Sequence, residues 1–184
     1  MTDEIRIATE ADRTALVHTV VEAFRNDPAF TWFFQEAYDE QAPLFTEALF
    51  DCRIATNGIW VTDSVQAVAL WDLPGAAMSS DLSGLSPEAI ARLDEYHDVV
   101  HHLMPEQPFW YLGVLASHPD RRGSGLATVV CREGLQAATR DGVPAVLETT
   151  APDNVAMYER RGWSVHASAE MDALTVWVMT HPGA

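Results

Sequence analysis

The chain contains no lysine, so all 11 of its basic residues are arginines. This absence excludes a Walker A phosphate loop, which needs a Gly-Lys-Ser/Thr sequence. It also excludes a pyridoxal-phosphate Schiff base and a Ser-x-x-Lys nucleophile, because both chemistries use a lysine amine. Any phosphate site in this chain must therefore be built from other groups.

Cysteines and long apolar runs are equally scarce. Cys52 and Cys131 fall in separate helical patterns, which argues against a disulfide framework and a cysteine metal site and favours core positions. No run of eighteen apolar residues occurs, and the N-terminus lacks the basic flank and apolar core of a signal peptide. We expect a cytoplasmic protein without a membrane partner, and its 184 residues are most simply one domain, 1–184.

Positive charge is scarce in the N-terminal half, and the net charge of the chain is −16. Residues 1–105 hold 18 acidic residues and 5 arginines, whereas residues 106–161 hold 7 acidic residues and 6 arginines. Such a chain should repel nucleic acid, and a cleft formed by its first half should favour a cationic partner. The alternative is that the acidic surface only aids solubility.

Strand and helix patterns alternate along the chain. The predicted strands cover residues 5–8, 59–62, 65–73, 110 to before Pro119, 145–149, 164–169 and 174–180. The predicted helices follow Thr9, cover residues 40–56, 86–103 and 124–140, and include a short helix from Asp153 to Gly162. The strand from residue 110, the helix after it and the strand 145–149 form a βαβ unit, which is expected to be parallel.

The turn inside this βαβ unit looks like an anion site. After Pro119 the chain runs through Arg121, Arg122, Gly123 and Gly125 into the helix. Glycines at the start of a helix leave its unpaired N–H groups open, and the helix dipole adds partial positive charge there. A phosphate or diphosphate is the natural ligand. A dinucleotide fingerprint fits poorly, because Thr128 stands at the third glycine position.

Two motifs resemble the GNAT superfamily of N-acetyltransferases. Arg122-x-x-Gly125-x-Ala127 resembles its motif A, which holds the diphosphate of acetyl-coenzyme A, and Asn154-x-x-x-Tyr158-x-x-x-Gly162-Trp163 is similar to its motif B, with Trp163 for the usual phenylalanine. Within the superfamily, the chain looks most like the puromycin-acetyltransferase-like branch in three stretches taken together: Phe24-x-x-Asp27-Pro28, Trp110-Tyr111-Leu112-Gly113-Val114 with the later Pro119, and Leu147-Glu148-Thr149. The resemblance implies an α/β (α+β) GNAT fold: a mixed central sheet of six to seven strands, flanked by helices, with splayed central parallel strands.

The resemblance also assigns residues to acetyl-CoA as co-substrate. The strand backbone would hold the pantetheine arm, the loop the diphosphate, and Asn154 and Tyr158 the region of the sulfur. In order, these residues are Leu115, Ala116, Ser117, Arg121, Arg122, Gly123, Ser124, Gly125, Leu126, Ala127, Asn154 and Tyr158. Gly113 lies within the strand and is consistent with a bulge that opens its edge.

Tyr158 and Glu148 are the candidate catalytic residues. In the resemblance, Tyr158 lies beside the cofactor sulfur, where a phenol can protonate a thiolate. Glu148 could accept the proton of an amine or could simply bond to neighbouring backbone. Tyr111, three histidines or ordered water are alternative bases. The histidines, two of them at i, i+4 spacing, lack a third ligand, so we expect no metal site; they are His97, His101 and His102.

The function implied is transfer of an acetyl group from acetyl-CoA to the primary amine of a small cationic molecule, such as an antibiotic-like or metabolite amine, without a covalent enzyme intermediate. The alternatives are a non-catalytic acyl-CoA sensor and a protein or peptide amine acetyltransferase. Aromatic residues 30–34 either belong to the core or form a wall of the acceptor pocket. The sequence leaves the oligomeric state open, a homodimer included.

Overall fold

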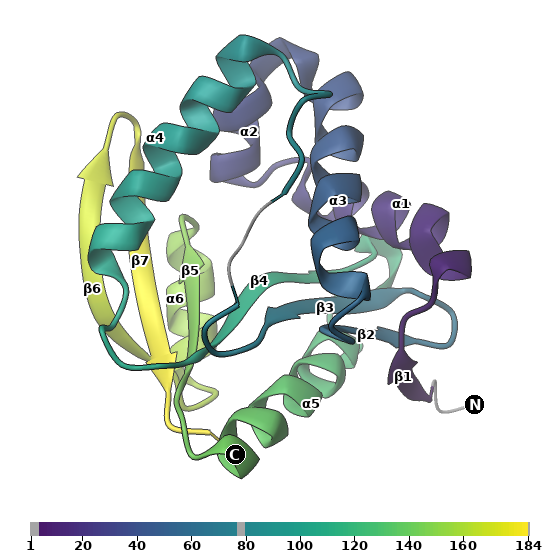
Figure 1. The fold of residues 1–184 in the computed structure, drawn as a ribbon, viewed down its shortest axis with the longest axis vertical. Helices are drawn as coiled ribbons and strands as arrows, with labels where there is room; N and C mark the ends of the chain where they lie inside the picture. The colour runs from purple at the N-terminus through teal and green to yellow at the C-terminus, as the bar shows by residue number, and fades with distance from the viewer. Residues whose placement is uncertain (1–3, 77–79, 184) are drawn as a thin grey trace.

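The computed structural model describes residues 4–76 and 80–183, which form a seven-stranded sheet flanked by helices (Figure 1). The strand order is β1-β2-β3-β4-β5-β7-β6. Among the described strands, β4 and β5 pair in parallel and the other neighbours pair antiparallel. The strands are β1 (Ile5–Ile7), β2 (Ile59–Thr62), β3 (Ala67–Asp72), β4 (Trp110–Ser117), β5 (Ala145–Thr149), β6 (Ser164–Met171) and β7 (Leu174–His181). The predicted mixed fold is confirmed.

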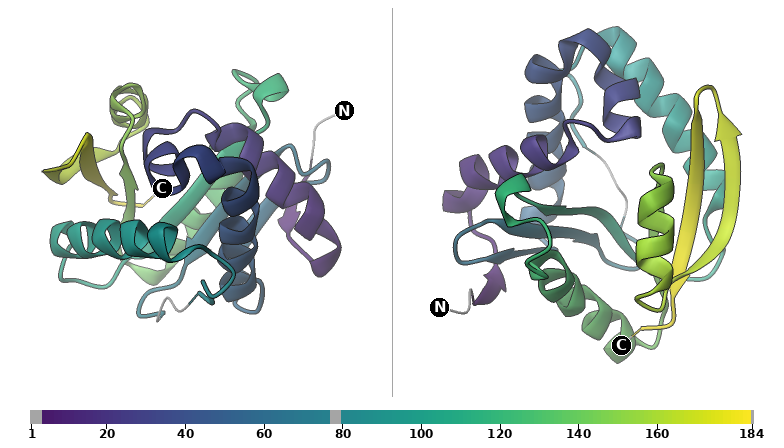
Figure 2. Two further views of the ribbon diagram at one scale, coloured as in Figure 1. Left: turned by 90° about the horizontal axis from the view of Figure 1, so that it is seen from above. Right: turned by 180° about the vertical axis from the view of Figure 1, so that it is seen from behind.

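Among the described residues, six α-helices flank this sheet (Figures 1 and 2). They are α1 (Arg13–Phe24), α2 (Pro28–Phe34), α3 (Tyr38–Ile54), α4 (Pro87–Leu103), α5 (Leu126–Asp141) and α6 (Pro152–Glu159). Helix α5 covers one face of β2–β4, and α1 and α3 cover the other, whereas α4 packs against β6 and β7. In the part of the chain that the structure describes, no helix has the length and apolar character needed to span a membrane.

Local side chains set several element boundaries. Asp27 caps α2 by accepting hydrogen bonds from the N–H groups of Ala29 and Phe30, and Ser86 caps α4 in the same way from Ala89. Helix α5 begins at Leu126 rather than at the predicted Ser124, because Gly125 has a left-handed φ of 82°. Strand β3 begins at Ala67 rather than at the predicted Val65, which turns with a φ of 52°.

Three clusters of buried side chains form the core. The α5 face of the sheet packs around Trp71 and Trp110, and the opposite face packs around Phe50 against α1. A third cluster joins α2, α3 and α4 around Phe33 and Phe34. The two free cysteines lie in different places: Cys131 is buried as predicted, whereas Cys52 is only half-buried. The third cluster contains no side chain of the sheet and forms a hydrophobic layer of its own between these helices.

Gly134 fixes how closely α5 approaches the sheet. A Cβ atom at this position would overlap the indole ring of Trp71, which is fully buried. Because the ring cannot move without disturbing the core around it, any side chain here overpacks the interface.

We therefore expect Gly134→Ala to lower the free energy of unfolding by about 1–3 kcal/mol, measured by urea denaturation. Gly84→Ala is the matched control, since a Cβ there meets nothing within 4 Å and no loss of stability is expected. Equal stability of the Gly134 variant and the original protein would contradict this account of the packing.

Candidate active site

The site begins where β4 and β5 separate. Their parallel pairing runs only from Trp110–Ala145 to Leu112–Leu147. Beyond these residues β4 continues to Ser117 and β5 to Thr149, and the two strands diverge (Figure 1). The predicted splay of the central strands is thus present.

A bulge at Gly113 accompanies the separation. Leu70 pairs with Val114 and Trp71 pairs with Leu112, so Gly113 is the extra residue of β4. A Cβ on Gly113 would lie 2.9 Å from the Arg53 guanidinium, which forms a buried ion pair with Asp72 at 2.7 Å. The bulge therefore needs glycine, as its place within the strand suggested.

The separation leaves one edge of β4 without a neighbouring strand. His118 donates its N–H to Gln66 O on the β3 side at 2.9 Å. Because main-chain groups alternate sides along a strand, Ala116 also faces β3, whereas Leu115 and Ser117 face the open side. These two residues present N–H and C=O groups to any chain that lies in the gap.

The loop that follows β4 is open to solvent. Residues 120–125 are exposed, and a Cβ on Gly125 would meet nothing within 4 Å. The loop is held from within, since the Ser124 hydroxyl donates to Arg121 O at 2.6 Å. Gly125 is the N-cap of α5 and supplies no side-chain cap, so the first N–H groups of the helix point out of the loop. The predicted anion site is therefore accessible.

A cavity of about 460 Å³ fills the gap between β4 and β5. Four of the predicted site residues line it, and they come from β4, β5 and α6: Leu115, Glu148, Asn154 and Tyr158. The other predicted residues do not line it, because they lie further along the chain at the end of β4, in the loop and at the start of α5. They are Ala116, Ser117, Arg121, Arg122, Gly123, Ser124, Gly125, Leu126 and Ala127.

Glu148 carries an ionisable carboxyl into the cavity. Burial raises its pKa from 4.5 to about 7, and a hydrogen bond of 2.6 Å from the Tyr111 hydroxyl lowers the pKa in part. The folded chain binds this proton more tightly than the unfolded chain, so the free energy of unfolding falls as pH rises from 4.5 through about 7. A carboxyl that titrates near neutral pH is suited to accept and release protons.

Tyr158 brings a phenol to the same cavity from α6. Its side chain is buried and packs against Trp163, with ring centroids 5.8 Å apart. Burial raises the pKa of Tyr158 well above its ordinary value, so its hydroxyl keeps its proton at neutral pH and can donate it. One turn earlier, Asn154 Nδ2 donates to Thr149 Oγ1 at 3.3 Å. A carboxyl and a phenol therefore share one cavity.

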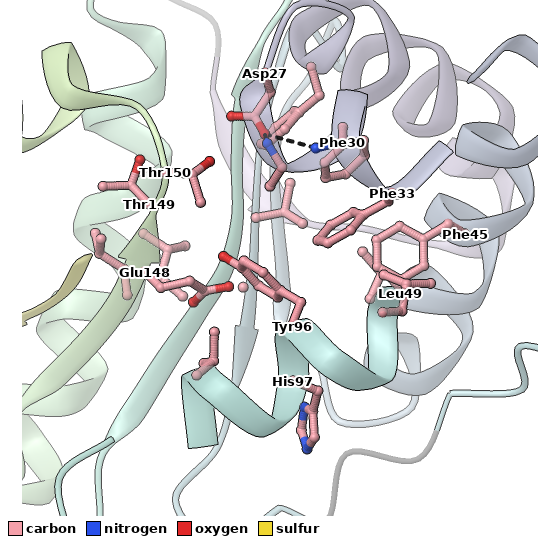
Figure 3. A pocket seen from close by; sticks show the side chains of 18 of the residues that line it. Asp27, Phe30, Phe33, Phe45, Leu49, Tyr96, His97, Glu148, Thr149 and Thr150 are labelled. Carbon is pink, nitrogen blue, oxygen red and sulfur yellow. Dashed lines mark hydrogen bonds between the residues drawn. The ribbon is translucent and has the colours of Figure 1, made fainter. Parts of the chain in front are cut away.

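The cavity also contains residues that were not assigned to the site from the sequence. Asp27, from the Phe24-x-x-Asp27-Pro28 sequence, lines it from the N-cap of α2, and Phe45, Tyr96 and Thr150 line it from α3, α4 and the residue after β5 (Figure 3). The Asp-Pro pair could have indicated the helix cap at Asp27. Nothing local in the sequence could have found the others, because they meet only when α3 and α4 fold over β4 and β5.

Some of the aromatic residues and histidines that the sequence singled out line the cavity, and others do not. Phe30 and Phe33 are core residues that also line the cavity, whereas Trp32 and Phe34 do not line it. His97 reaches the rim of the cavity, but His101 and His102 do not line it. The i, i+4 spacing of His97 and His101 brings their rings into stacking contact, with the ring centroids 6.2 Å apart. No group of three or more metal-ligating side chains occurs among residues 4–76 and 80–183.

One family model matches part of the chain. Residues 87–163 match the family model described as "Acetyltransferase (GNAT) family". A structure described as histone acetyltransferase HPA2 and related acetyltransferase from Corynebacterium glutamicum is 26% identical, with a TM-score of 0.69 over 100% of this chain and 98% of that chain.

Two more distant structures are also similar. Arylalkylamine N-acetyltransferase 2 from Aedes aegypti is 11% identical, with a TM-score of 0.76 over 99% of each chain. A chain of the NatC complex bound to Gag peptide and CoA is 11% identical, with a TM-score of 0.59 over 100% of each chain. At this identity, these two matches show the fold alone.

The pKa of Glu148 provides a test of the site geometry. Tyr111→Phe removes a hydrogen bond that stabilises the charged carboxylate, so we expect the pKa of Glu148 to rise above about 7. Carbon-13 NMR of the glutamate carboxyl carbons, titrated against pH, measures the midpoint. Tyr38→Phe removes a buried hydroxyl that donates to Val21 O, outside the cavity, and should leave the midpoint unchanged. An unshifted or lower midpoint in the Tyr111 variant would refute this description.

Proposed function

We propose that this chain, an acetyltransferase of the GNAT superfamily that uses acetyl-CoA, transfers the acetyl group to the primary amine of a small cationic molecule. One observation carries the proposal: a carboxyl with a pKa of about 7 and a protonated phenol line the same cavity at the gap between β4 and β5. A sheltered cavity with such a pair suits a reaction in which protons move to and from nitrogen and sulfur.

The fit to acetyl-CoA rests on two open main-chain surfaces. Leu115 and Ser117 offer hydrogen-bonding groups along the open edge of β4, which suits an amide-containing arm such as pantetheine. The exposed loop from Arg121 to Ala127 offers helix N–H groups and two arginines, which suit a diphosphate. Since β4 leads directly into the loop, one extended molecule could bind to both surfaces.

Each proton transfer has a candidate group. When bound, acetyl-CoA supplies a thioester carbon and a thiolate leaving group. Glu148, in its charged form, accepts a proton from the acceptor nitrogen, and Tyr158 Oη donates a proton to the sulfur as the carbon–sulfur bond breaks. The Leu115 N–H stabilises the developing charge on the carbonyl oxygen. The transfer is direct, so no acyl group is attached to the protein.

The charges around the cavity favour a cationic acceptor. Asp27 and Glu148 are half-buried residues whose carboxyls line it. Arg53 also lines it, but its charge is balanced by Asp72. A positively charged amine is therefore attracted before it loses its proton. A sensor that only holds acyl-CoA would need neither Glu148 nor Tyr158 at these positions.

Two finer assignments complete the proposal. The Phe24-x-x-Asp27-Pro28 sequence supports the puromycin-acetyltransferase-like branch, since Phe24 and Asp27 both line the cavity. We also keep a cytoplasmic location as part of the proposal, because the reaction draws on acetyl-CoA.

The role of Tyr158 is tested by Tyr158→Phe. We expect kcat for coenzyme A release with an amine panel to fall at least tenfold, because the departing sulfur loses its proton donor, whereas the affinity for coenzyme A changes little. Tyr38→Phe is the control: it removes a buried hydroxyl that donates to Val21 O, away from the cavity, and should leave kcat unchanged. Full turnover by the Tyr158 variant would remove this residue from the acid role.

The loop assignment is tested by Gly125→Val. The side chain would block the approach of a diphosphate to the helix N–H groups, so we expect the Kd for coenzyme A, measured by calorimetry, to rise at least tenfold. Gly142→Val imposes similar strain at the other end of α5, since both glycines have positive φ and open surroundings. This control should lose stability but keep its affinity. The same Kd for both variants would count against the diphosphate site.

A further inference from the structure

The cavity has two chemically different sides (Figure 3). Glu148, Thr149 and Thr150 form one side, at the end of β5. Phenylalanine rings and Leu49 form the other, on α2 and α3, and Tyr96 reaches between them from α4 with its hydroxyl toward Glu148. A ligand that fills the cavity must therefore be polar at one end and apolar at the other.

The apolar side is built from rings set at steep angles to one another. The Phe33 ring lies 5.0 Å from the Tyr96 ring at 80° and 6.3 Å from the Phe45 ring at 67°. Phe30 lies 5.7 Å from Phe45 at 67°. Such an array presents both ring faces and ring edges, which is the surface that another aromatic ring packs against most favourably.

The polar side has an unused hydrogen-bonding group besides its carboxyl. Thr150 is 5% exposed, and its hydroxyl has no hydrogen-bond partner in the described residues. Burying a hydroxyl without a hydrogen-bond partner costs free energy, so we expect a polar group of the ligand to form a hydrogen bond with the Thr150 hydroxyl. An ammonium near Glu148 could donate to both Glu148 and Thr150.

The geometry points to an acceptor in which a short aliphatic chain joins a primary ammonium to an aromatic ring, with the ring against Phe33 and Phe45 and the nitrogen beside Glu148 and Thr150. This inference rests on the proposed acetyl transfer and narrows its substrate class. It makes the rings of α2, α3 and α4 the determinants of specificity.

Other amines match this cavity less well. A linear diamine would have to bury its second ammonium on the side of the phenylalanine rings, where Asp27 Oδ1 already accepts hydrogen bonds from two main-chain N–H groups and most of the lining is apolar, so desolvation is costly. A peptide would need hydrogen-bond partners for its main chain, which the phenylalanine side chains cannot supply. An alkylamine fits the apolar side, but it has no aromatic ring of its own to pack against the phenylalanine rings.

The first experiment compares four acceptors with acetyl-CoA: 2-phenylethylamine, n-hexylamine, putrescine and a short peptide with a free N-terminus. We expect kcat/KM for 2-phenylethylamine to exceed that for n-hexylamine at least threefold and the other two by more. An equal or higher value for any of the other three overturns the inference but leaves acetyl transfer intact. Coenzyme A release no faster than without amine, for every acceptor, would instead overturn the proposed function.

A substitution at Phe45 then tests the contribution of its aromatic ring alone. Phe45 is half-buried, and Phe45→Leu keeps an apolar side chain there while removing the aromatic ring. We expect kcat/KM for 2-phenylethylamine to fall about tenfold and that for n-hexylamine to stay within about twofold, which also shows that the variant is folded. Leu44→Ala, at an exposed neighbour outside the cavity, is the control and should change neither value. An equal loss for both amines, or no loss, overturns the role of the ring.

Discussion

The separation of β4 from β5 beyond Leu112 and Leu147 is the constraint on which the site depends. It interrupts the sheet where main-chain pairing would otherwise be satisfied, and Gly113, the bulged residue of β4 opposite β3, directly follows the last residue of β4 that pairs with β5. The same gap provides a hydrogen-bonding edge and a cavity.

Trp32 Nε1 donates to Asp172 Oδ2 at 2.8 Å and so connects α2, which carries part of the aromatic wall, to the turn between β6 and β7.

Burial raises the pKa of both candidate catalytic residues, but with different consequences for their protonation. It raises the pKa of Glu148 into the neutral range, so this group can take up a proton and lose it again. It also raises the pKa of Tyr158, a group that is already neutral, and thereby secures its proton. Tyr111 moderates the first effect through its hydrogen bond, and Asp72 balances Arg53 beneath the bulge. The chemistry proposed here thus follows from how the side chains are desolvated.

The sequence predicted the parts of the site that lie close together along the chain. The strand, loop and helix from Trp110 to Asp141 follow from local rules of glycine, proline and hydrophobic alternation, with an error of two residues where Gly125 turns left-handed. For the aromatic wall, the sequence indicated residues 30–34, of which Phe30 and Phe33 line the cavity. Phe45 and Tyr96 did not follow from local rules, because they read as ordinary helix residues until α3 and α4 pack over the gap. Nor could local patterns indicate that Thr150 would be buried without a partner.

Hydrogen exchange along β4, with and without coenzyme A, shows whether the open edge of this strand binds the cofactor. We expect the amides of Leu115 and Ser117 to exchange more slowly when saturating coenzyme A is present, because the cofactor arm occupies the open edge. Ala116, whose amide faces β3, should not change. Unaltered exchange at Leu115 and Ser117 in the presence of bound coenzyme A would contradict the account.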